Sequence, residues 1–195
     1  MRARFKLKVF EVIMALISLF IFLPLFFYGT KALSTEIRPV PYNKKEVMKK
    51  MASEIKPVAK SYGLKPSLII GQALLESQYG RTLLASKYHN LYSLPTKSNQ
   101  NYIDLKTPIY RSGSWANEDM RFSVYHNWTE STIDYLNALR TGRYLDKALY
   151  KQLVLAKDDS EAAQLLQYYS FNTDPNYANK LKLMINDNRL TKYDK

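Results

Sequence analysis

One glutamate, Glu76, lies in the last turn of a predicted helix whose other residues are mostly apolar. The segment reads Gln72-Ala-Leu-Leu-Glu-Ser-Gln-Tyr-Gly80. Pro66 suits the first turn of this helix and Gly80 suits its end. Glu76 is therefore expected near the negative end of the helix dipole among apolar neighbours, and both influences disfavour its ionised form. A carboxyl that keeps its proton near neutral pH can act as a general acid, whereas the alternative is an ordinary solvated helix glutamate.

Three separated segments carry a resemblance to a known family. They are Gln72–Gly80 followed by Leu84-Ala85 and Tyr88-His-Asn-Leu-Tyr92, then Arg121-Phe-Ser-Val-Tyr-His-Asn-Trp-Thr-Glu-Ser131, then Tyr169-Ser-Phe-Asn-Thr-Asp-Pro-Asn-Tyr-Ala-Asn-Lys-Leu181. In this order they resemble the bacterial peptidoglycan N-acetylglucosaminidases of glycoside hydrolase family 73, which include many autolysins and flagellar wall-remodelling enzymes. The likeness spans about residues 43 to 192.

The resemblance implies a fold, an activity and a substrate. The expected fold is α+β and mostly α, lysozyme-like, with a small β-lobe and a substrate cleft that holds Glu76. The expected enzyme is an endo-β-N-acetylglucosaminidase that needs no cofactor and cuts the N-acetylglucosaminyl-β-1,4-N-acetylmuramyl bond of peptidoglycan. Two alternatives stay open, because fold alone does not fix function. One is a lytic transglycosylase or muramidase on the same fold, and the other is a non-catalytic peptidoglycan-binding scaffold.

The second acid of a glycosidase is harder to find in this sequence. Glycoside hydrolysis usually uses two carboxyl groups. The family's second acid lies in a Thr-x-Glu segment of the β-lobe, but the matching segment here, Thr107-Pro-Ile, has Ile109 in that place. Glu118 and Asp119 are the preferred substitutes, ahead of Asp104. The alternative is that they belong to a polar loop without a catalytic role.

Tyr177 is a second candidate catalytic residue. An N-acetylglucosamine unit carries a possible nucleophile in its 2-acetamido oxygen, so one acid and one orienting group can suffice. The resemblance places Tyr177 near the scissile bond, where its phenol could bind the acetamido group or the developing charge. The alternative is a tyrosine of the core.

Substrate contacts are expected from aromatic side chains, because aromatic faces stack on sugar rings. The candidates are Tyr88, Tyr92, Trp115 and Trp128. Asn90 is expected to hold either a loop or a sugar amide. His89 and His126 form no spacing typical of a metal site, so no metal is expected, and the sequence contains no cysteine nucleophile or phosphate-binding loop.

Helical spacing and capping residues predict most of the elements. The first expected helix starts after Asn43, which pairs with Glu46 in a capping box, and others start at Pro66, Leu145 and Ser160. The helix that starts at Thr129 is expected to be capped by Asn127, and the last helix is expected to have Asp174 as its N-cap and Pro175 as its first residue. Pro57 is expected to kink or shorten the first helix. Short strands are predicted at 102–105, 109–111 and 120–125.

The N-terminus indicates a membrane anchor. Residues 9–28 are apolar except for Glu11, Ser18 and Pro24, and this run is long enough for one transmembrane helix. The alternative is a cleaved signal peptide, but the run is long and Thr30-Lys-Ala32 is a poor match to a cleavage site, so a retained anchor is favoured. Basic residues in 1–8 predict a cytoplasmic N-terminus, with a linker at 29–42 and the glucosaminidase domain at 43–195 outside the cell membrane. The expected partners are peptidoglycan strands, the membrane and optionally another membrane protein. The net charge of +12 does not indicate nucleic acid, because the domain is expected outside the cell.

Overall fold

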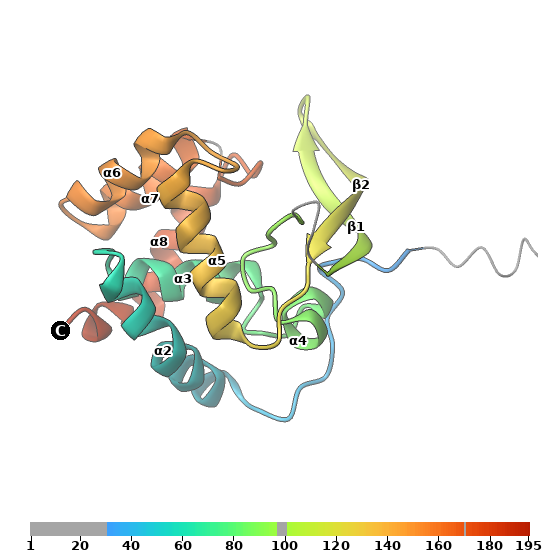
Figure 1. Cartoon of the computed structure of the whole chain (residues 1–195), viewed down its shortest axis with the longest axis horizontal. Coiled ribbons are helices and arrows are strands. Elements are labelled where there is room, and N and C mark those ends of the chain that lie inside the picture. Colours follow the sequence, from blue (N-terminus) through green and yellow to red (C-terminus); the bar gives the residue numbers. More distant parts are fainter. Residues whose placement is uncertain (1–30, 97–100, 170) are drawn as a thin grey trace, which may run out of the picture. The chain divides into compact units, whose positions relative to one another are not determined.

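The computed structural model describes residues 31–96, 101–169 and 171–195. Its elements are α2 (Lys44–Ser61), α3 (Pro66–Glu76), α4 (Leu83–Tyr88), β1 (Tyr102–Arg111), β2 (Ser114–Ser123), α5 (Trp128–Thr141), α6 (Lys147–Leu155), α7 (Asp159–Tyr168), α8 (Tyr177–Asp187) and the 3-10 helix η1 (Leu190–Tyr193). Residues 32–195 form one compact unit. This part of the chain is mostly helical with one small antiparallel sheet, as predicted (Figure 1).

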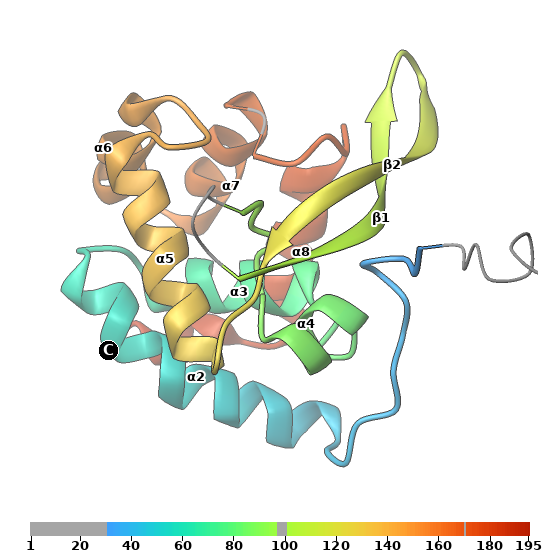
Figure 2. The same ribbon diagram turned by 45° about the vertical axis from the view of Figure 1, so that its right-hand side comes forward.

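Helix α3 is the central helix of this unit. Its residues from Pro66 to Leu74 are all buried, because α2, α7, α8 and η1 pack around it. Figures 1 and 2 show α3 inside the group of helices, with the hairpin of β1 and β2 extending away from them. A helix that is apolar on all sides needs such complete cover. The element that carries Glu76 is therefore also the core of the fold.

The predicted helix starts agree with the structure at several points. The Asn43 side chain accepts hydrogen bonds from Lys45 N and Glu46 N, and Glu46 accepts one from Asn43 N, which completes the predicted capping box. Asn127 caps α5 through Glu130 N at 2.8 Å. These bonds satisfy backbone donors that a helix start would otherwise leave unpaired.

Pro57 does not shorten its helix, and one other helix ends earlier than predicted. Helix α2 continues through Pro57 to Ser61, so Pro57 does not end it, and the buried residues Val58 and Ala59 hold this last turn against the core. Helix α3 ends at Glu76 and not near Gly80, because the Ser77 hydroxyl takes over the turn by bonding Ala73 O and accepting from Gly80 N at 2.8 Å. Glu76 is thus the last helical residue.

The β-lobe is one regular hairpin. The predicted short strands are parts of two ten-residue strands, and the segment considered as a polar loop is the first half of β2. The register pairs Leu105 with Met120 and Thr107 with Glu118. Ser112 and Gly113 connect the strands with positive φ angles of 52° and 82°, a conformation that favours two-residue hairpin turns.

Residues 32–38, which we call the N-terminal strap, lie against the hairpin and α4. Ser34 N donates to Lys106 O at 2.8 Å and Lys106 N donates to Ala32 O at 3.0 Å. Further along the strap, Leu83 N donates to Glu36 O at 2.7 Å. The buried Ser34 hydroxyl also donates to Thr107 Oγ1 at 3.0 Å. Much of the segment predicted as a linker is therefore bonded to the domain.

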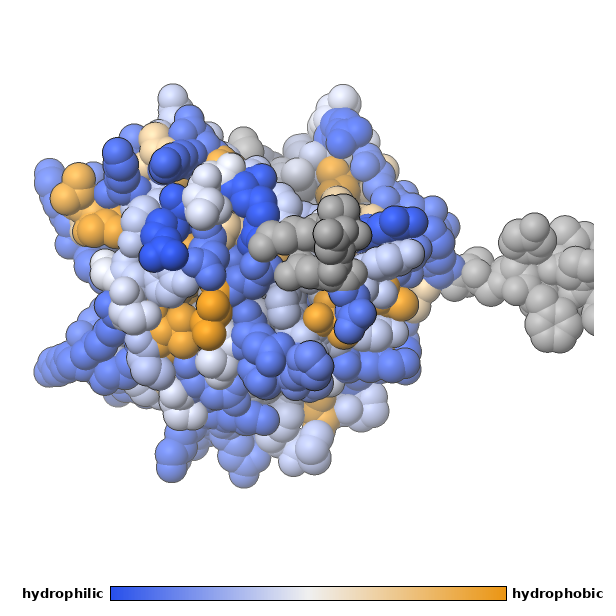
Figure 3. Space-filling model, viewed as in Figure 1, coloured by the Kyte–Doolittle hydropathy of each residue, from blue (hydrophilic) through white to orange (hydrophobic). Residues whose placement is uncertain are grey.

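Apolar residues of this unit gather in two clusters. One large cluster joins α2, α3, α5, α7 and α8, and a smaller one lies between α4 and the hairpin around Leu84, Leu105 and Phe122. On the face drawn in Figure 3, hydrophilic residues dominate and hydrophobic ones form small separate groups. Among the described residues, no helix has the length and apolar character needed to cross a bilayer. The predicted transmembrane segment 9–28 lies outside those residues.

Candidate active site

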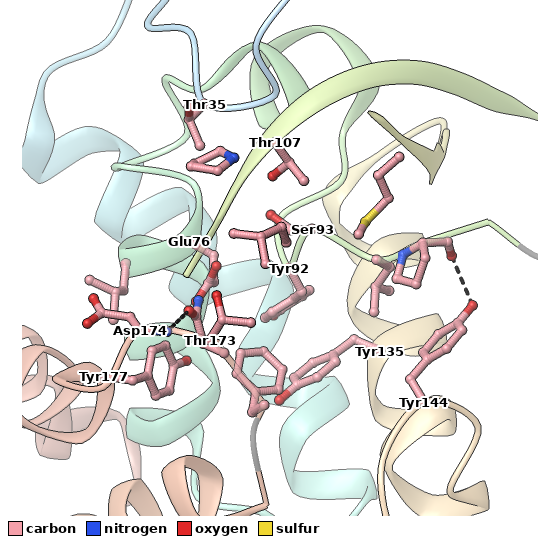
Figure 4. Close-up of a pocket in the computed structure, with 18 of the residues that line it drawn as sticks. Thr35, Glu76, Tyr92, Ser93, Thr107, Tyr135, Tyr144, Thr173, Asp174 and Tyr177 are labelled. Carbon is pink, nitrogen blue, oxygen red and sulfur yellow. Dashed lines mark hydrogen bonds between the residues drawn. The ribbon is translucent and has the colours of Figure 1, made fainter. Parts of the chain in front are cut away.

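A cavity of about 590 Å³ opens where the end of α3 faces the hairpin, α5 and the loop before α8. Such a volume is typical of sites for small organic ligands. Glu76 lines it together with residues from each of these elements, and Figure 4 shows Thr35 and Thr107 on one side and Tyr144 on the other. The hairpin also touches the loop before α8 directly, because Tyr110 N donates to Thr173 Oγ1 at 3.1 Å.

Glu76 is partly buried and hydrogen-bonded at this cavity. Asn172 Nδ2 donates to its Oε1 at 3.1 Å, and the Tyr177 hydroxyl also interacts with the carboxylate. Burial raises the pKa of Glu76 to about 7, even though the hydrogen bonds from Asn172 and Tyr177 act in the opposite direction. The nearby charge of Asp174 adds to the rise. Near neutral pH the carboxyl therefore exists in both protonation states, which suits a group that first gives and then takes a proton.

The turn after α3 fixes where Glu76 points. Gln78, Tyr79 and Gly80 all have positive φ, so the chain reverses sharply directly after the helix. At Gly80 a Cβ would meet Tyr42 Oη at 2.9 Å and Trp128 at 3.2 Å. Only glycine combines this φ of 72° with so close an approach. The glycine predicted as a helix stop thus forms the turn behind the candidate acid.

The cavity holds one further carboxylate among the described residues, Asp174, which the sequence predicts only as a helix cap. Its Oδ1 accepts from Asn176 N at 2.9 Å and its Oδ2 pairs with Lys180. Burial works against the charge, but the bonds from Lys180 and the Asn176 amide outweigh it and lower the pKa of Asp174. Helix α8 starts at Tyr177, so Asp174 bonds the turn that leads into the helix and is not itself the N-cap.

The acids predicted from the hairpin do not line this cavity. Glu118 forms an ion pair with Arg111 at 3.2 Å, and Asp119 is exposed on the neighbouring position of β2. Asp104 pairs with Arg121 at 3.2 Å. Ile109 does line the cavity, at the place where the family's second acid is expected. The wall that the hairpin contributes is therefore formed by apolar and hydroxyl side chains.

The predicted substrate-binding residues fall into two groups. Tyr92 and Trp115 line the cavity, and Trp115 is 54% exposed and packs edge-on against Tyr110. Asn90, Tyr88 and Trp128 do not line it.

Each residue of the second group has a structural contact instead. The buried Asn90 side chain bonds Leu94 N, Leu94 O and Ser123 O, which supports the loop alternative over the sugar amide. Trp128 is buried and its ring nitrogen donates to Ala85 O at 3.2 Å. Tyr88 packs on the small apolar cluster of the hairpin.

Sequence reasoning missed the groups that surround Glu76 and Tyr177. They are Asn172 and Asp174 in the loop before α8, Tyr135 on α5, Phe171, and Gln72 on α3. A signal existed for Gln72, since it precedes Glu76 by four residues and so lies on the same helix face. The sequence contains no such signal for Tyr135, because its contact with Gln72 depends on how α5 packs against the other helices. No group of His, Asp or Glu in the described residues could hold a metal ion.

Comparisons with known proteins agree with these features. Residues 52–190 match the family described as mannosyl-glycoprotein endo-beta-N-acetylglucosaminidase, or glucosaminidase. A probable N-acetylmuramidase of Lactococcus lactis is 34% identical over 146 residues, covering 74% of this chain and 33% of that protein. The exo-glucosaminidase LytG of Bacillus subtilis is 31% identical over 133 residues, covering 68% of this chain and 47% of that protein. The chain thus spans about a third to a half of the length of these relatives.

A solved structure shares the architecture. The catalytic domain of the autolysin Auto from Listeria monocytogenes is 30% identical, with a TM-score of 0.69 over 81% of this chain and 91% of that one. The match to the family begins at residue 52, so the N-terminal strap, which bonds the hairpin, lies before it.

Proposed function

Because this chain belongs to the glucosaminidase family of glycoside hydrolases, we propose that it is a peptidoglycan hydrolase that cuts the N-acetylglucosaminyl-β-1,4-N-acetylmuramyl bond. The observation that carries the proposal is Glu76, a partly buried carboxyl with a pKa raised to about 7 at the wall of a large cavity. Raised carboxyl pKa values are typical of the general acids of glycosidases.

In the proposed reaction Glu76 protonates the leaving glycosidic oxygen. The proton is available because burial keeps the carboxyl neutral through much of the neutral range. Once the proton has left, the negative charge is stabilised by the Asn172 amide and the Tyr177 hydroxyl, which both interact with the carboxylate. The same carboxylate then takes a proton from the water that completes hydrolysis.

The nucleophile is proposed to come from the substrate. The described cavity residues include no carboxylate other than Glu76 and Asp174, and Asp174 is bonded by Lys180 and a backbone amide. The 2-acetamido oxygen would attack the anomeric carbon as the glycosidic bond breaks and Glu76 gives its proton to the leaving oxygen, and water would then open the cyclic intermediate. Tyr177 is proposed to stabilise the developing charge, because its hydroxyl interacts with the Glu76 carboxylate.

The bond that is cut has a second candidate. One relative is named a probable N-acetylmuramidase and another an exo-glucosaminidase, so relatives of similar identity differ in this respect. A muramidase or lytic transglycosylase would use the same Glu76 but leave an N-acetylmuramic acid end, reducing or anhydro. The site geometry is compatible with either product, because both bonds join N-acetylated sugars.

The anchor is a further part of the proposal. Residues 9–28 are proposed to cross the cell membrane, with residues 1–8 in the cytoplasm and the domain on the cell-wall side. Because the compact unit begins at Ala32, little sequence separates the proposed anchor from the domain. Fractionation of cells that express the full chain, followed by protease treatment of intact protoplasts, tests this. Degradation of the domain from outside is expected, and complete protection would refute the orientation.

The activity is tested with a fragment that starts at residue 32, so that the N-terminal strap is kept. Wild type and Glu76→Gln are incubated with purified peptidoglycan, and the released ends are reduced and identified by mass spectrometry. Reduced N-acetylglucosamine ends from wild type alone are expected. N-acetylmuramic acid ends would indicate the second candidate, and binding without products would indicate a scaffold. Glu118→Gln tests the hairpin acid: unchanged turnover supports the substrate-assisted route, and a loss as large as that of Glu76→Gln would refute it.

A further inference from the structure

A chain of buried polar side chains lies behind Tyr177. Gln72 on α3 bonds two tyrosines at once: Tyr135 Oη on α5 donates to its Oε1 at 3.0 Å, and its Nε2 donates to Tyr177 Oη on α8 at 3.4 Å. The three residues are 0 to 1% exposed. Their hydrogen bonds link α3, α5 and α8, and Figure 4 shows Tyr135, Tyr177 and Glu76 around one part of the cavity.

Burial makes these bonds obligatory. A buried amide has to find both a donor and an acceptor within the protein, since leaving either end unpaired is costly. For Gln72 the partners in the structure are the two tyrosine hydroxyls. Burial and the charge of Glu76 raise the pKa of Tyr177 well above its ordinary value, so its hydroxyl keeps its proton and remains a donor.

The direction of the chain decides what Tyr177 can do. Because Tyr135 donates to the carbonyl end of Gln72, the amide nitrogen faces Tyr177 and donates to its oxygen. A hydroxyl that accepts from Gln72 has its own proton free for another acceptor, and the carboxylate of Glu76 is adjacent. With the amide reversed, the carbonyl would take the Tyr177 proton away from Glu76. In the orientation found, the Tyr135 hydroxyl satisfies the Gln72 carbonyl, and the Gln72 amide is left to donate to Tyr177.

Aromatic packing holds this arrangement in place. The ring of Tyr135 stacks on Tyr92 with centroids 4.3 Å apart. Phe171 contacts both Tyr135 and Tyr177, with centroid distances of 5.6 Å and 5.4 Å. Rings packed at these distances have little freedom to move, so the hydroxyl oxygens of Tyr135 and Tyr177 are held in position.

We propose that Tyr135 and Gln72 are positioning residues of the active site, which hold the Tyr177 hydroxyl with its proton toward Glu76. This proposal rests on the proposed function of Glu76 as the acid. Neither residue needs to touch the substrate. Their effect is to stabilise the Glu76 carboxylate after it has given up its proton, and so to set the pH range in which the acid works.

The test compares Tyr135→Phe, Gln72→Met and the double variant in the fragment that starts at residue 32. Tyr125→Phe is a matched control. It also removes a tyrosine hydroxyl that bonds α5, since Tyr125 Oη donates to Asp134 Oδ2 at 2.8 Å, but Tyr125 does not line the cavity. The Glu76 carboxyl is titrated by NMR with a ¹³C label at the glutamate side chains, using Glu76→Gln to assign its signal. Turnover on peptidoglycan and thermal unfolding are measured in parallel.

Tyr135→Phe and Gln72→Met are expected to raise the pKa of Glu76 by about half a unit and to lower kcat by about threefold to tenfold, with little change in KM. The double variant is expected to match Gln72→Met alone, since both changes break one chain. Tyr125→Phe is expected to leave the titration unchanged. An unshifted titration in both single variants, with only a lower melting temperature, would overturn the proposal. The titration needs no turnover, so it remains decisive even if the fragment proves to be a scaffold.

Discussion

Replacing Glu76 by glutamine is expected to stabilise the folded domain at alkaline pH. The folded-state pKa of Glu76 is about 7, against 4.5 for the group in an unfolded chain, because burial penalises the charge. Below about pH 4.5 the carboxyl is protonated in both states, and its full contribution to stability is present. Between pH 4.5 and 7 the unfolded chain loses the proton first, so the free energy of unfolding of the wild type falls. The difference of about 2.5 units corresponds to at most about 3 kcal/mol.

In Glu76→Gln the new side chain keeps an oxygen that can accept from Asn172, but it does not titrate. The free energy of unfolding of the variant therefore does not fall between pH 4.5 and 7 for this reason. Urea unfolding at pH 4, 6 and 8.5 measures the difference in the free energy of unfolding between wild type and Glu76→Gln. The stability gained by the variant should grow between pH 4 and about pH 7 and be level by pH 8.5. Glu130→Gln is the opposite control, because hydrogen bonds from His126 lower the pKa of Glu130 and its contribution is lost toward acidic pH. A gain that is the same at all three pH values would refute the assignment of a partly buried, proton-retaining Glu76.

Three further changes have expected outcomes. Tyr177→Phe removes a hydroxyl that stabilises the Glu76 carboxylate, so the alkaline limb of the pH dependence of kcat/KM should move to higher pH while the maximum falls; an unmoved limb would contradict the contact. Ser34→Ala removes the buried bond to Thr107 and should lower the free energy of unfolding by about 1 kcal/mol, with faster amide exchange in β1 as the second readout. Gly80→Ala places a Cβ at positive φ against close neighbours and should cost about 1–3 kcal/mol in chemical denaturation, and a neutral effect would mean that this turn relaxes freely.

The sequence predicted the fold well where a local pattern carries the information. The capping box at Asn43, the N-cap at Asn127 and the glycine turn at Gly80 each depend on a few neighbouring residues, and the structure confirms the first two bonds directly. The position of Glu76 at the end of an apolar helix was also predictable, because both helix signals lie within one segment. Local rules are strongest for such features.

The surroundings of Glu76 were less predictable, because they come from elements far apart in the chain. Asn172 lies 96 residues from Glu76, and Tyr135 lies 63 residues from Gln72. Nothing in the local sequence distinguishes Tyr135 from the other tyrosines of the chain. Trp128 was expected to stack on a sugar ring because it is aromatic, and Asn90 to hold either a loop or a sugar amide, but residue type alone does not show whether a side chain faces the substrate or the protein interior.

The N-terminal strap has a consequence for the order in which the domain can fold. The contacts within the β1–β2 hairpin and within each helix join residues that are near one another in the sequence. Ser34 and Thr107, in contrast, are 73 residues apart. Closing so long a loop lowers the conformational entropy of the chain before the hydrogen bonds that stabilise it can form. We therefore expect this contact to form late. During synthesis the strap leaves the ribosome well before its partners do. The wall of the cavity that contains Thr35 is therefore expected to be completed only after α4 and the hairpin have formed.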